Sequence, residues 1–213
     1  PAPSDINELT QPITAHVRIL DSFDPAHKAF GEMRRAGFTA VCALPGSGNL
    51  IGGQGLGLKN HESNLVEDMV IEGSTQMKMA LGENPRRVYS QQKKLPSTRM
   101  GNAALLRETL FDAKVYSDKL REAETDASKA PTPNFKLEAL VPVIRGEMRC
   151  RIHAHRADDI QTAVRIAEEF VLDICIEHTP AGRRIPTWLA GKKLPCAAGP
   201  PTLGRPNPEG GRT

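Results

Sequence analysis

Three histidines stand at the ends of two consecutive strand-like segments. His153 and His155 follow residues 148–152, a mixture of apolar and charged residues that is typical of a short buried strand. His178 stands directly after residues 173–177, a second segment of this kind. In α/β proteins, ligands and metals are bound at the C-terminal ends of strands. The spacing therefore predicts that these imidazoles meet at one edge of a sheet.

An amphipathic segment, residues 160–170, follows the first two histidines and is predicted to be a helix. Asp158 and Asp159 lie at its start, where a helix N-terminus favours negative charge and side-chain caps. Arg156 can bind a substrate carboxylate in bidentate geometry, and we predict it as a substrate-binding residue. The alternative is an ion pair between Arg156 and one of the two aspartates.

Imidazoles on successive strand ends suit a hydrolytic metal site. Such a site needs neutral imidazoles and carboxylates on rigid elements, with an open position for water. The metal lowers the pKa of that water to about 7 and polarises the scissile carbonyl. Either histidine alone would be expected to be a hydrogen-bonded structural residue, but His153 and His178 together predict metal ligands. His155 shares the face of His153 on a regular strand, or contacts substrate where the backbone turns.

Lys78 lies within an apolar strand-like segment, residues 77–81, and a buried lysine needs a partner. Glu83, five residues later, and Glu177 are the candidate partners for a salt bridge. On an extended strand Glu177 points away from His178, so it is expected to pair within the wall of the sheet.

Composition excludes several classes of function. Hydrophobic residues make up 39% and charged residues 25% of the 213 residues, which is ordinary for a soluble globular protein. The net charge is only +3, the basic pairs are scattered, and aromatic residues are 4%, so nucleic-acid binding is not expected. No segment is long and apolar enough to span a membrane. The four cysteines form no CxxC pair, which indicates buried thiols in a reducing compartment.

No signal peptide is apparent, so the protein is expected in the cytoplasm. The chain opens with Pro1 rather than an initiator methionine, which indicates a trimmed or processed start. Residues 206–213, the end of a tail rich in Gly, Pro and Arg, are expected to be disordered.

Hydrophobic patterns and Gly/Pro positions predict the remaining elements. The expected strands are residues 38–44, 66–71, 77–81, 148–152, 173–177 and 194–198. The expected helices are residues 25–35, 102–122, 135–144, 160–170 and 181–191, the last interrupted at Pro186. Strands that alternate with helices favour a parallel sheet with right-handed crossovers. The first strand is expected to be parallel and covered on both faces.

A Gly-rich segment, residues 45–55, is expected to be a tight loop near a ligand. It lacks the Lys-Ser/Thr of a P-loop and the GxGxxG phasing of a dinucleotide-binding turn. A phosphate-binding α/β enzyme that uses this loop is therefore a weaker alternative. The absence of that fingerprint, with polar groups collected at strand ends, favours a (β/α) barrel over a Rossmann sheet.

Six motifs together identify a resemblance: Ile152-His153-Ala154-His155, Ile176-Glu177-His178, Lys78-Met79-Ala80-Leu81-Gly82-Glu83-Asn84-Pro85, Leu44-Pro45-Gly46-Ser47, Ile51-Gly52-Gly53-Gln54-Gly55 and Ser97-Thr98-Arg99-Met100-Gly101. They resemble the metal-dependent amidohydrolase superfamily, in an imidazolonepropionase-related or prolidase-like branch. The resemblance implies a partial (β/α)8 TIM barrel over residues 1–205. It lacks the first and last strands, because no HxH precedes residues 38–44 and no late strand ends in the family's Asp.

The family pattern implies one or two divalent metals, most plausibly zinc, at the barrel mouth. His153 matches the fifth-strand ligand and His178 the sixth-strand ligand. Lys78 stands where the family carries a carboxylated lysine that bridges two metals, and Glu83 is a rival carboxylate ligand. The predicted catalytic residues are thus Lys78, His153 and His178, with His155 and Arg156 for substrate.

The resemblance implies a hydrolase that cleaves C–N bonds in small amides, cyclic amides or peptides by metal-activated water. The alternative is a catalytically inert barrel fragment or pseudo-enzyme that binds one metal weakly, because half the family's ligands are not found. An open barrel exposes strand edges, so a homo-oligomer is also expected.

Overall fold

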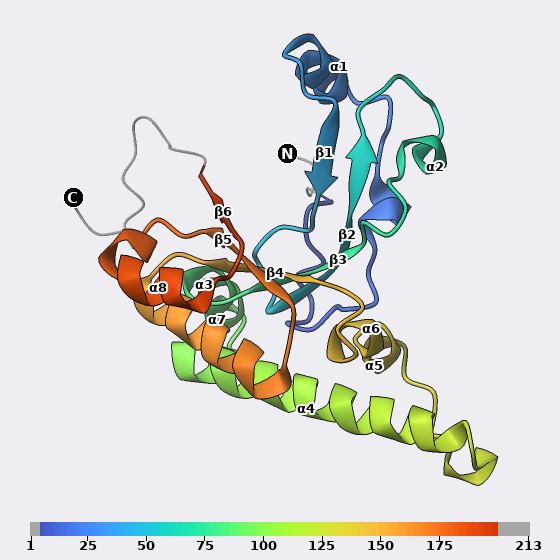
Figure 1. Ribbon diagram of the computed structural model, residues 1–213, viewed down its shortest axis with the longest axis vertical. Coiled ribbons are helices and arrows are strands. Elements are labelled where there is room, and N and C mark those ends of the chain that lie inside the picture. Colours follow the sequence, from blue (N-terminus) through green and yellow to red (C-terminus); the bar gives the residue numbers. More distant parts are fainter. Residues whose placement is uncertain (1–4, 200–213) are drawn as a thin grey trace.

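The computed structural model describes residues 5–199 as a mixed α/β fold built on one curled six-stranded sheet, consistent with part of a barrel (Figure 1). The strands follow one another across the sheet in chain order. They are β1 (Ala40–Ala43), β2 (Ile51–Lys59), β3 (Gln76–Ala80), β4 (Cys150–Ala154), β5 (Ile174–His178) and β6 (Cys196–Ala198). The first three strands pair antiparallel, whereas β3, β4, β5 and β6 pair in parallel.

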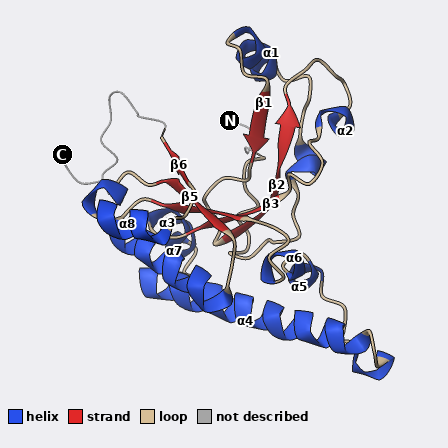
Figure 2. Ribbon diagram, viewed as in Figure 1, coloured by secondary structure: helices blue, strands red, loops and turns tan. Residues whose placement is uncertain are grey.

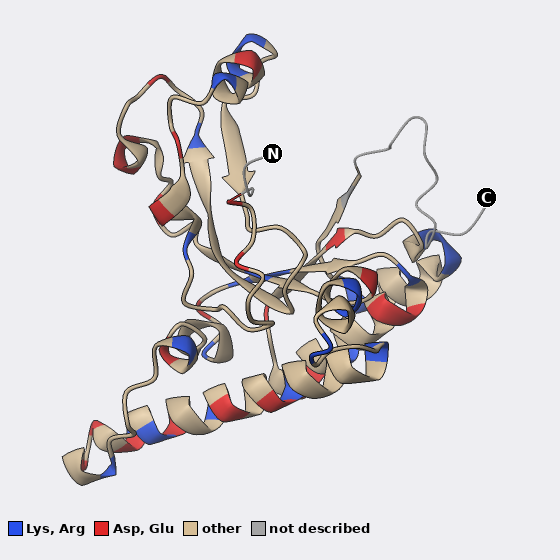
Figure 3. Cartoon of the chain, turned by 180° about the vertical axis from the view of Figure 1, so that it is seen from behind, with Lys and Arg blue, Asp and Glu red and all other residues tan. Residues whose placement is uncertain are grey.

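Helices lie in the connections from β2 onward, whereas a loop joins β1 to β2 (Figure 2). The α-helices are α1 (Lys28–Arg35), α2 (Val66–Met69), α3 (Glu83–Gln91), α4 (Arg99–Ala123), α5 (Phe135–Glu138), α6 (Val141–Ile144), α7 (Ala157–Phe170) and α8 (Pro186–Lys192). Short 3-10 turns are η1 (Ile19–Ser22), η2 (Ala127–Lys129) and η3 (Gly182–Arg184). Within the described residues, no helix is both long and apolar enough to cross a membrane. Lys/Arg and Asp/Glu are interspersed along α4, the longest helix (Figure 3).

The parallel part of the sheet has one apolar and one polar face. Met77, Met79, Ile152 and Ile176 alternate along their strands and are buried in the main core, which includes residues of α4 and α7. The intervening positions carry the polar side chains of Lys78, Arg151, His153 and Glu177 on the opposite face. Because side chains alternate along a strand, one helix-covered face fixes which residues the other face presents.

A smaller lobe, consisting of β1, the outer half of β2, α1 and α2, extends away from the helix-covered part of the sheet (Figure 1). Leu56, Leu58 and Met69 form its separate small core. Two expectations fail here. Residues 66–71 were predicted to be a strand but form the short helix α2, and residues 38–44 contain an antiparallel, half-exposed strand. A short apolar run does not by itself distinguish a covered strand from a half-exposed one.

The Gly-rich segment is also corrected, because its second half is the start of β2 rather than a loop. Gly53 has φ +122°, and a Cβ there would collide with the carbonyl oxygen of Val17. A Cβ on Gly55 would lie 2.5 Å from the carbonyl oxygen of Ala43. Glycine at these two positions permits the neighbouring backbone to approach closely. The pairing of β2 with β3 also shifts register between Ile51 and Gly53, which marks a β-bulge.

Other boundaries shift in smaller ways. The helix predicted over 135–144 is two short helices, and the one predicted from 25 begins at Lys28. Pro186 begins α8 instead of interrupting a helix, as expected for proline in a first turn. Helix α3 was not predicted. The predicted tail, residues 206–213, lies outside the described residues.

Candidate metal centre

The histidines and one glutamate lie at the C-terminal edge of the parallel strands. His153 is the fourth residue of β4, and His155 follows that strand immediately. His178 is the last residue of β5. Glu83 is the first residue of α3, three positions after β3 ends. Because β3, β4 and β5 run in parallel, their C-terminal ends bring all four side chains to one edge of the sheet.

The three imidazoles face one another closely. Ring centroids are 4.2 Å apart for His153 and His155, and 5.0 Å apart for His153 and His178. Glu83 Oε1 lies 2.6 Å from His155 Nδ1 and 3.8 Å from His153 Nε2. Ligand atoms of Glu83, His153 and His155 all lie within 4.8 Å of one another, as required to hold a single cation.

His178 reaches this group through an unusual backbone. Its φ of +70° and that of Thr179, +34°, lie in the left-handed region that residues other than glycine rarely adopt. On an extended strand its side chain would point away from that of Glu177, but the turn brings its ring beside His153. His178 Nδ1 lies 2.8 Å from the carbonyl oxygen of Gly199, so Nδ1 carries the proton and donates. Nε2 is thereby left as the basic nitrogen, which is the arrangement of metal-binding histidines.

Two buried polar atoms in this cluster lack a partner within the described residues. They are His153 Nδ1 and Glu83 Oε2. The His153 side chain is only 4% exposed, so water does not readily satisfy it. Buried polar atoms are almost always hydrogen-bonded, so two orphaned polar atoms in one cluster point to an ion or a water as their partner. The set of imidazoles and a carboxylate fits a divalent metal.

The electrostatics favour an anionic Glu83 beside a neutral His153 imidazole. Burial by itself raises the pKa of Glu83, but the nearby His153 imidazole and the hydrogen bond from His155 outweigh it and hold that pKa far below its usual value. The start of α3 adds a helix N-terminus, which also favours the carboxylate. Burial lowers the pKa of His153, so its neutral form is favoured despite the nearby Glu83. Neutral imidazole and ionised carboxylate are the protonation states that bind metal.

Lys78 is part of a separate ion-pair network on the same polar face. Its Nζ donates to Glu177 Oε2, and both side chains are almost fully buried. Arg151 donates to the other oxygen of Glu177 from Nε at 3.1 Å and from Nη2 at 2.9 Å. Of the two salt bridges predicted for Lys78, the one to Glu177 is present. The role of Lys78 as a carboxylated ligand stays a prediction. The ion pair with Glu177 does not favour it, because Lys78 is the cation of that pair.

Arg156 takes the alternative foreseen for it, a bidentate ion pair with Asp158 at 2.9 and 2.8 Å. Both side chains are about half exposed. Sequence reasoning missed Asn84, whose Nδ2 lies 3.1 Å from His153 Nε2. It also assigned His155 to substrate, whereas the geometry equally suits a metal ligand. A helix starting at Glu83 would have placed both Glu83 and Asn84 in its first turn.

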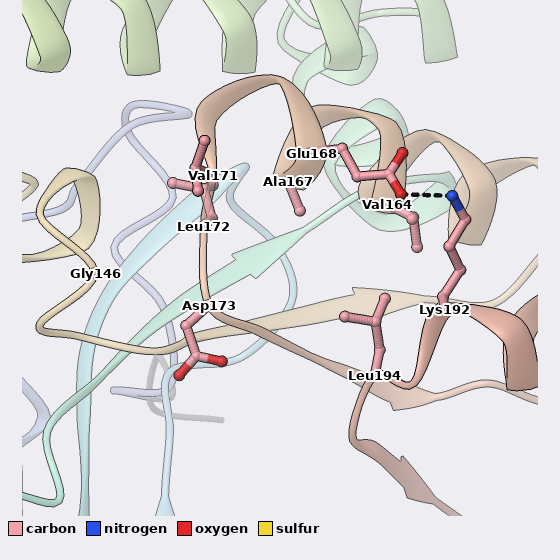
Figure 4. A pocket seen from close by; sticks show the side chains of 9 residues that line it. All are labelled: Gly146, Val164, Ala167, Glu168, Val171, Leu172, Asp173, Lys192 and Leu194. Carbon is pink, nitrogen blue, oxygen red and sulfur yellow. Dashed lines mark hydrogen bonds and ion pairs between the residues drawn. The ribbon is translucent and has the colours of Figure 1, made fainter.

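One cavity in the described part of the chain lies at the other end of the strands (Figure 4). It measures about 350 Å³ and is lined by residues that precede β4, β5 and β6, among them Gly146, Asp173 and Leu194. The Lys192–Glu168 ion pair lies at its side. It therefore does not belong to the histidine cluster.

Two comparisons found relatives that are named amidohydrolases. The chain is 42% identical to an amidohydrolase from Thermotoga maritima MSB8, and the two structures superpose with a TM-score of 0.92 over 97% of this chain and 54% of the other. It is 27% identical over 218 residues to Amidohydrolase tasK from Hapsidospora irregularis, a match to 91% of this chain and 22% of that protein. These likenesses support an amidohydrolase family. No family model matches. The chain spans about half the length of the solved relative and about a fifth of the curated one.

Proposed function

We propose that this chain carries part of the active site of a metal-dependent amidohydrolase that cleaves C–N bonds. The observation that carries the proposal is the cluster of Glu83, His153 and His155 with the His178 ring beside it. It lies at the C-terminal edge of parallel strands, where barrel enzymes hold their active sites. The sheet would then be part of an amidohydrolase-type (β/α)8 barrel, in the imidazolonepropionase-related or prolidase-like branch that the sequence motifs favour.

Zinc is the expected ion, with His153, His178 and Glu83 as its ligands and His155 as either a further ligand or a substrate contact. When bound, zinc supplies a Lewis acid that polarises a carbonyl and lowers the pKa of water. The chain's own residues prepare for this. Burial favours the neutral form of the His153 imidazole, and the hydrogen bond from His178 Nδ1 to the Gly199 carbonyl orients the His178 ring.

Glu83 is placed to bind the ion through one oxygen while the other fixes its orientation. Its Oε1 accepts from His155 Nδ1, while Oε2 has no partner within the described residues. A carboxylate with one oriented and one open oxygen can ligate the ion through the open oxygen. Arg156 lies just past the cluster, and a substrate carboxylate would compete with Asp158 for its guanidinium. This suggests small amides or peptides with a free carboxylate as substrates.

One observation favours a second candidate, a catalytically inert chain that binds one metal weakly. The described residues contain a single group of metal-ligating side chains, which is enough for one ion but not for a bridged pair. Lys78 pairs with Glu177 and does not extend the group.

Hydrolysis assays on the purified chain distinguish the two candidates. The chain is depleted of metal, reloaded with one equivalent of zinc, and offered N-acyl amino acids, dipeptides and cyclic amides. Zinc-dependent release of product that disappears in His153→Ala supports the hydrolase. Zinc binding without turnover on any of these classes supports the inert alternative.

A further inference from the structure

The first turn of α4 connects the two loops that carry the candidate ligands. Thr98 caps this helix by accepting the backbone N–H of Gly101 at 2.9 Å. Arg99 and Asn102 are three positions apart and therefore lie on the same side of the helix. Asn102 contacts Gly82, the residue before Glu83. Arg99 contacts Asp159 of α7, the helix that begins just after His155.

Asn102 holds the loop that presents Glu83. Its side chain is buried, at 1% exposure, and its Nδ2 donates to the carbonyl oxygen of Gly82 at 2.9 Å. Gly82 has φ +91° and ψ −136°, a conformation that only glycine adopts readily. The bond therefore fixes a peptide that the backbone would not hold by itself, directly before the candidate ligand Glu83.

Asp159 holds the same loop from the other side. Arg99 Nε lies 3.0 and 3.3 Å from its two carboxylate oxygens. The carboxylate packs against Gly82 so closely that a Cβ there would lie 2.5 Å from Asp159 Oδ2. Asp159 is the third residue of α7, so this contact ties the start of α7 to the peptide before Glu83.

The cost of burying Asn102 points to a positioning role. Asn102 Oδ1 is buried without a partner within the described residues, which costs stability. Packing alone would be served as well by a leucine of similar shape. The amide is distinguished from leucine by its bond to the Gly82 carbonyl.

We propose that Asn102 is a positioning residue that sets Glu83 at metal-binding distance from His153 and His155, with the Arg99–Asp159 pair as its second anchor. This inference rests on the proposed metal site. Loss of an outer partner of a metal ligand weakens metal binding by about 10- to 100-fold. Asn102 acts on Glu83 through one peptide, so we expect the lower end, about tenfold.

Zinc titration of the purified 213-residue chain, by competition with a chromophoric chelator, tests the proposal. Asn102→Leu should raise the zinc dissociation constant about tenfold. Ser117→Ala is the matched control: Ser117 is equally buried on the same helix, about 22 Å further along, and accepts from Arg145. It should lower the thermal midpoint without changing zinc affinity, which separates a positioning role from general destabilisation.

The outcomes are distinguishable. Equal zinc affinity in wild type and Asn102→Leu would overturn the positioning role while leaving the metal site in place. Absence of zinc binding in the wild type would overturn both proposals. If Asn102→Leu does not fold, Asp159→Asn decides, because it keeps the shape beside Gly82 and removes the charge that Arg99 holds. It should raise the zinc dissociation constant measurably but by less than about tenfold, and unchanged affinity would refute the inference.

Discussion

Removing either member of the buried Lys78–Glu177 pair should have unequal effects on stability. Glu177 accepts from two cations, so Lys78→Met leaves the carboxylate paired with Arg151. The loss is then one charge-assisted hydrogen bond, about 1.5–3 kcal/mol. Glu177→Met removes the only carboxylate that pairs with Lys78 among the described residues and leaves a lysine whose side chain is 4% exposed. An uncompensated buried charge costs about 3–5 kcal/mol.

The double variant gives the sharper expectation. Lys78→Met combined with Glu177→Met leaves Arg151, which is 19% exposed and still bonds Gln76 Oε1 at 3.3 Å. It should therefore be more stable than Glu177→Met alone, although it carries one substitution more. Urea unfolding followed by the fluorescence of Trp188 measures all four proteins, with linear extrapolation to water. A metal chelator is included, because ligand binding to the folded state would add its own stabilisation.

Two results would refute this reasoning. One is a loss in Lys78→Met equal to or larger than that in Glu177→Met. The other is a double variant as unstable as the sum of the singles, because that would show no coupling between the two residues. Either outcome would mean that Lys78 has a role other than pairing with Glu177, such as the carboxylated ligand that the family pattern implies.

Three further predictions concern pH, thiols and the N-terminal segment. Burial alone would raise the pKa of Glu177, but Lys78 and Arg151 outweigh burial and hold that pKa below its usual 4.5. The ionised Glu177 therefore contributes its full stabilisation above pH 4.5, and this is lost as the pH falls through the lower pKa of the folded state. Glu177→Met should accordingly lose less stability on acidification than the wild type. Under native conditions a thiol reagent should modify Cys42 and Cys196 quickly and the two buried cysteines only on unfolding. Tyr89→Phe removes a 2.6 Å bond from the buried hydroxyl to the Gln11 carbonyl and should lower the free energy of unfolding by about 0.5–1.5 kcal/mol, read from urea midpoints.

The parallel βα units and the meeting of their histidines could be predicted from sequence. Strand-like runs that alternate with helical runs predict parallel strands. Parallel strands bring their C-terminal ends to the same edge of the sheet. A lysine in an apolar strand could likewise be said to need an anion, with Glu177 as one of two candidates. These inferences depend only on the local residue pattern and on the direction of the chain, both of which can be read from the sequence.

Other features depend on contacts that no local pattern contains. Gly82 and Pro85 read as the end of a strand and a turn, so the helix beginning at Glu83 was missed, although proline is compatible with a first helical turn. The left-handed backbone of His178 overrides the strand alternation that would point its ring away. Glycines in β2 read as a loop, because the neighbouring backbone of Val17 that requires them is distant in sequence.

Zinc-edge X-ray absorption on the metal-loaded chain tests the central claim most directly. We predict one equivalent of zinc with only nitrogen and oxygen neighbours at about 2.0–2.1 Å, and outer-shell scattering from imidazoles. That signal should be absent from the His153→Ala/His178→Ala variant at the same zinc concentration. A sulfur shell at about 2.3 Å, or an unchanged spectrum and zinc content in the double variant, would contradict the assignment.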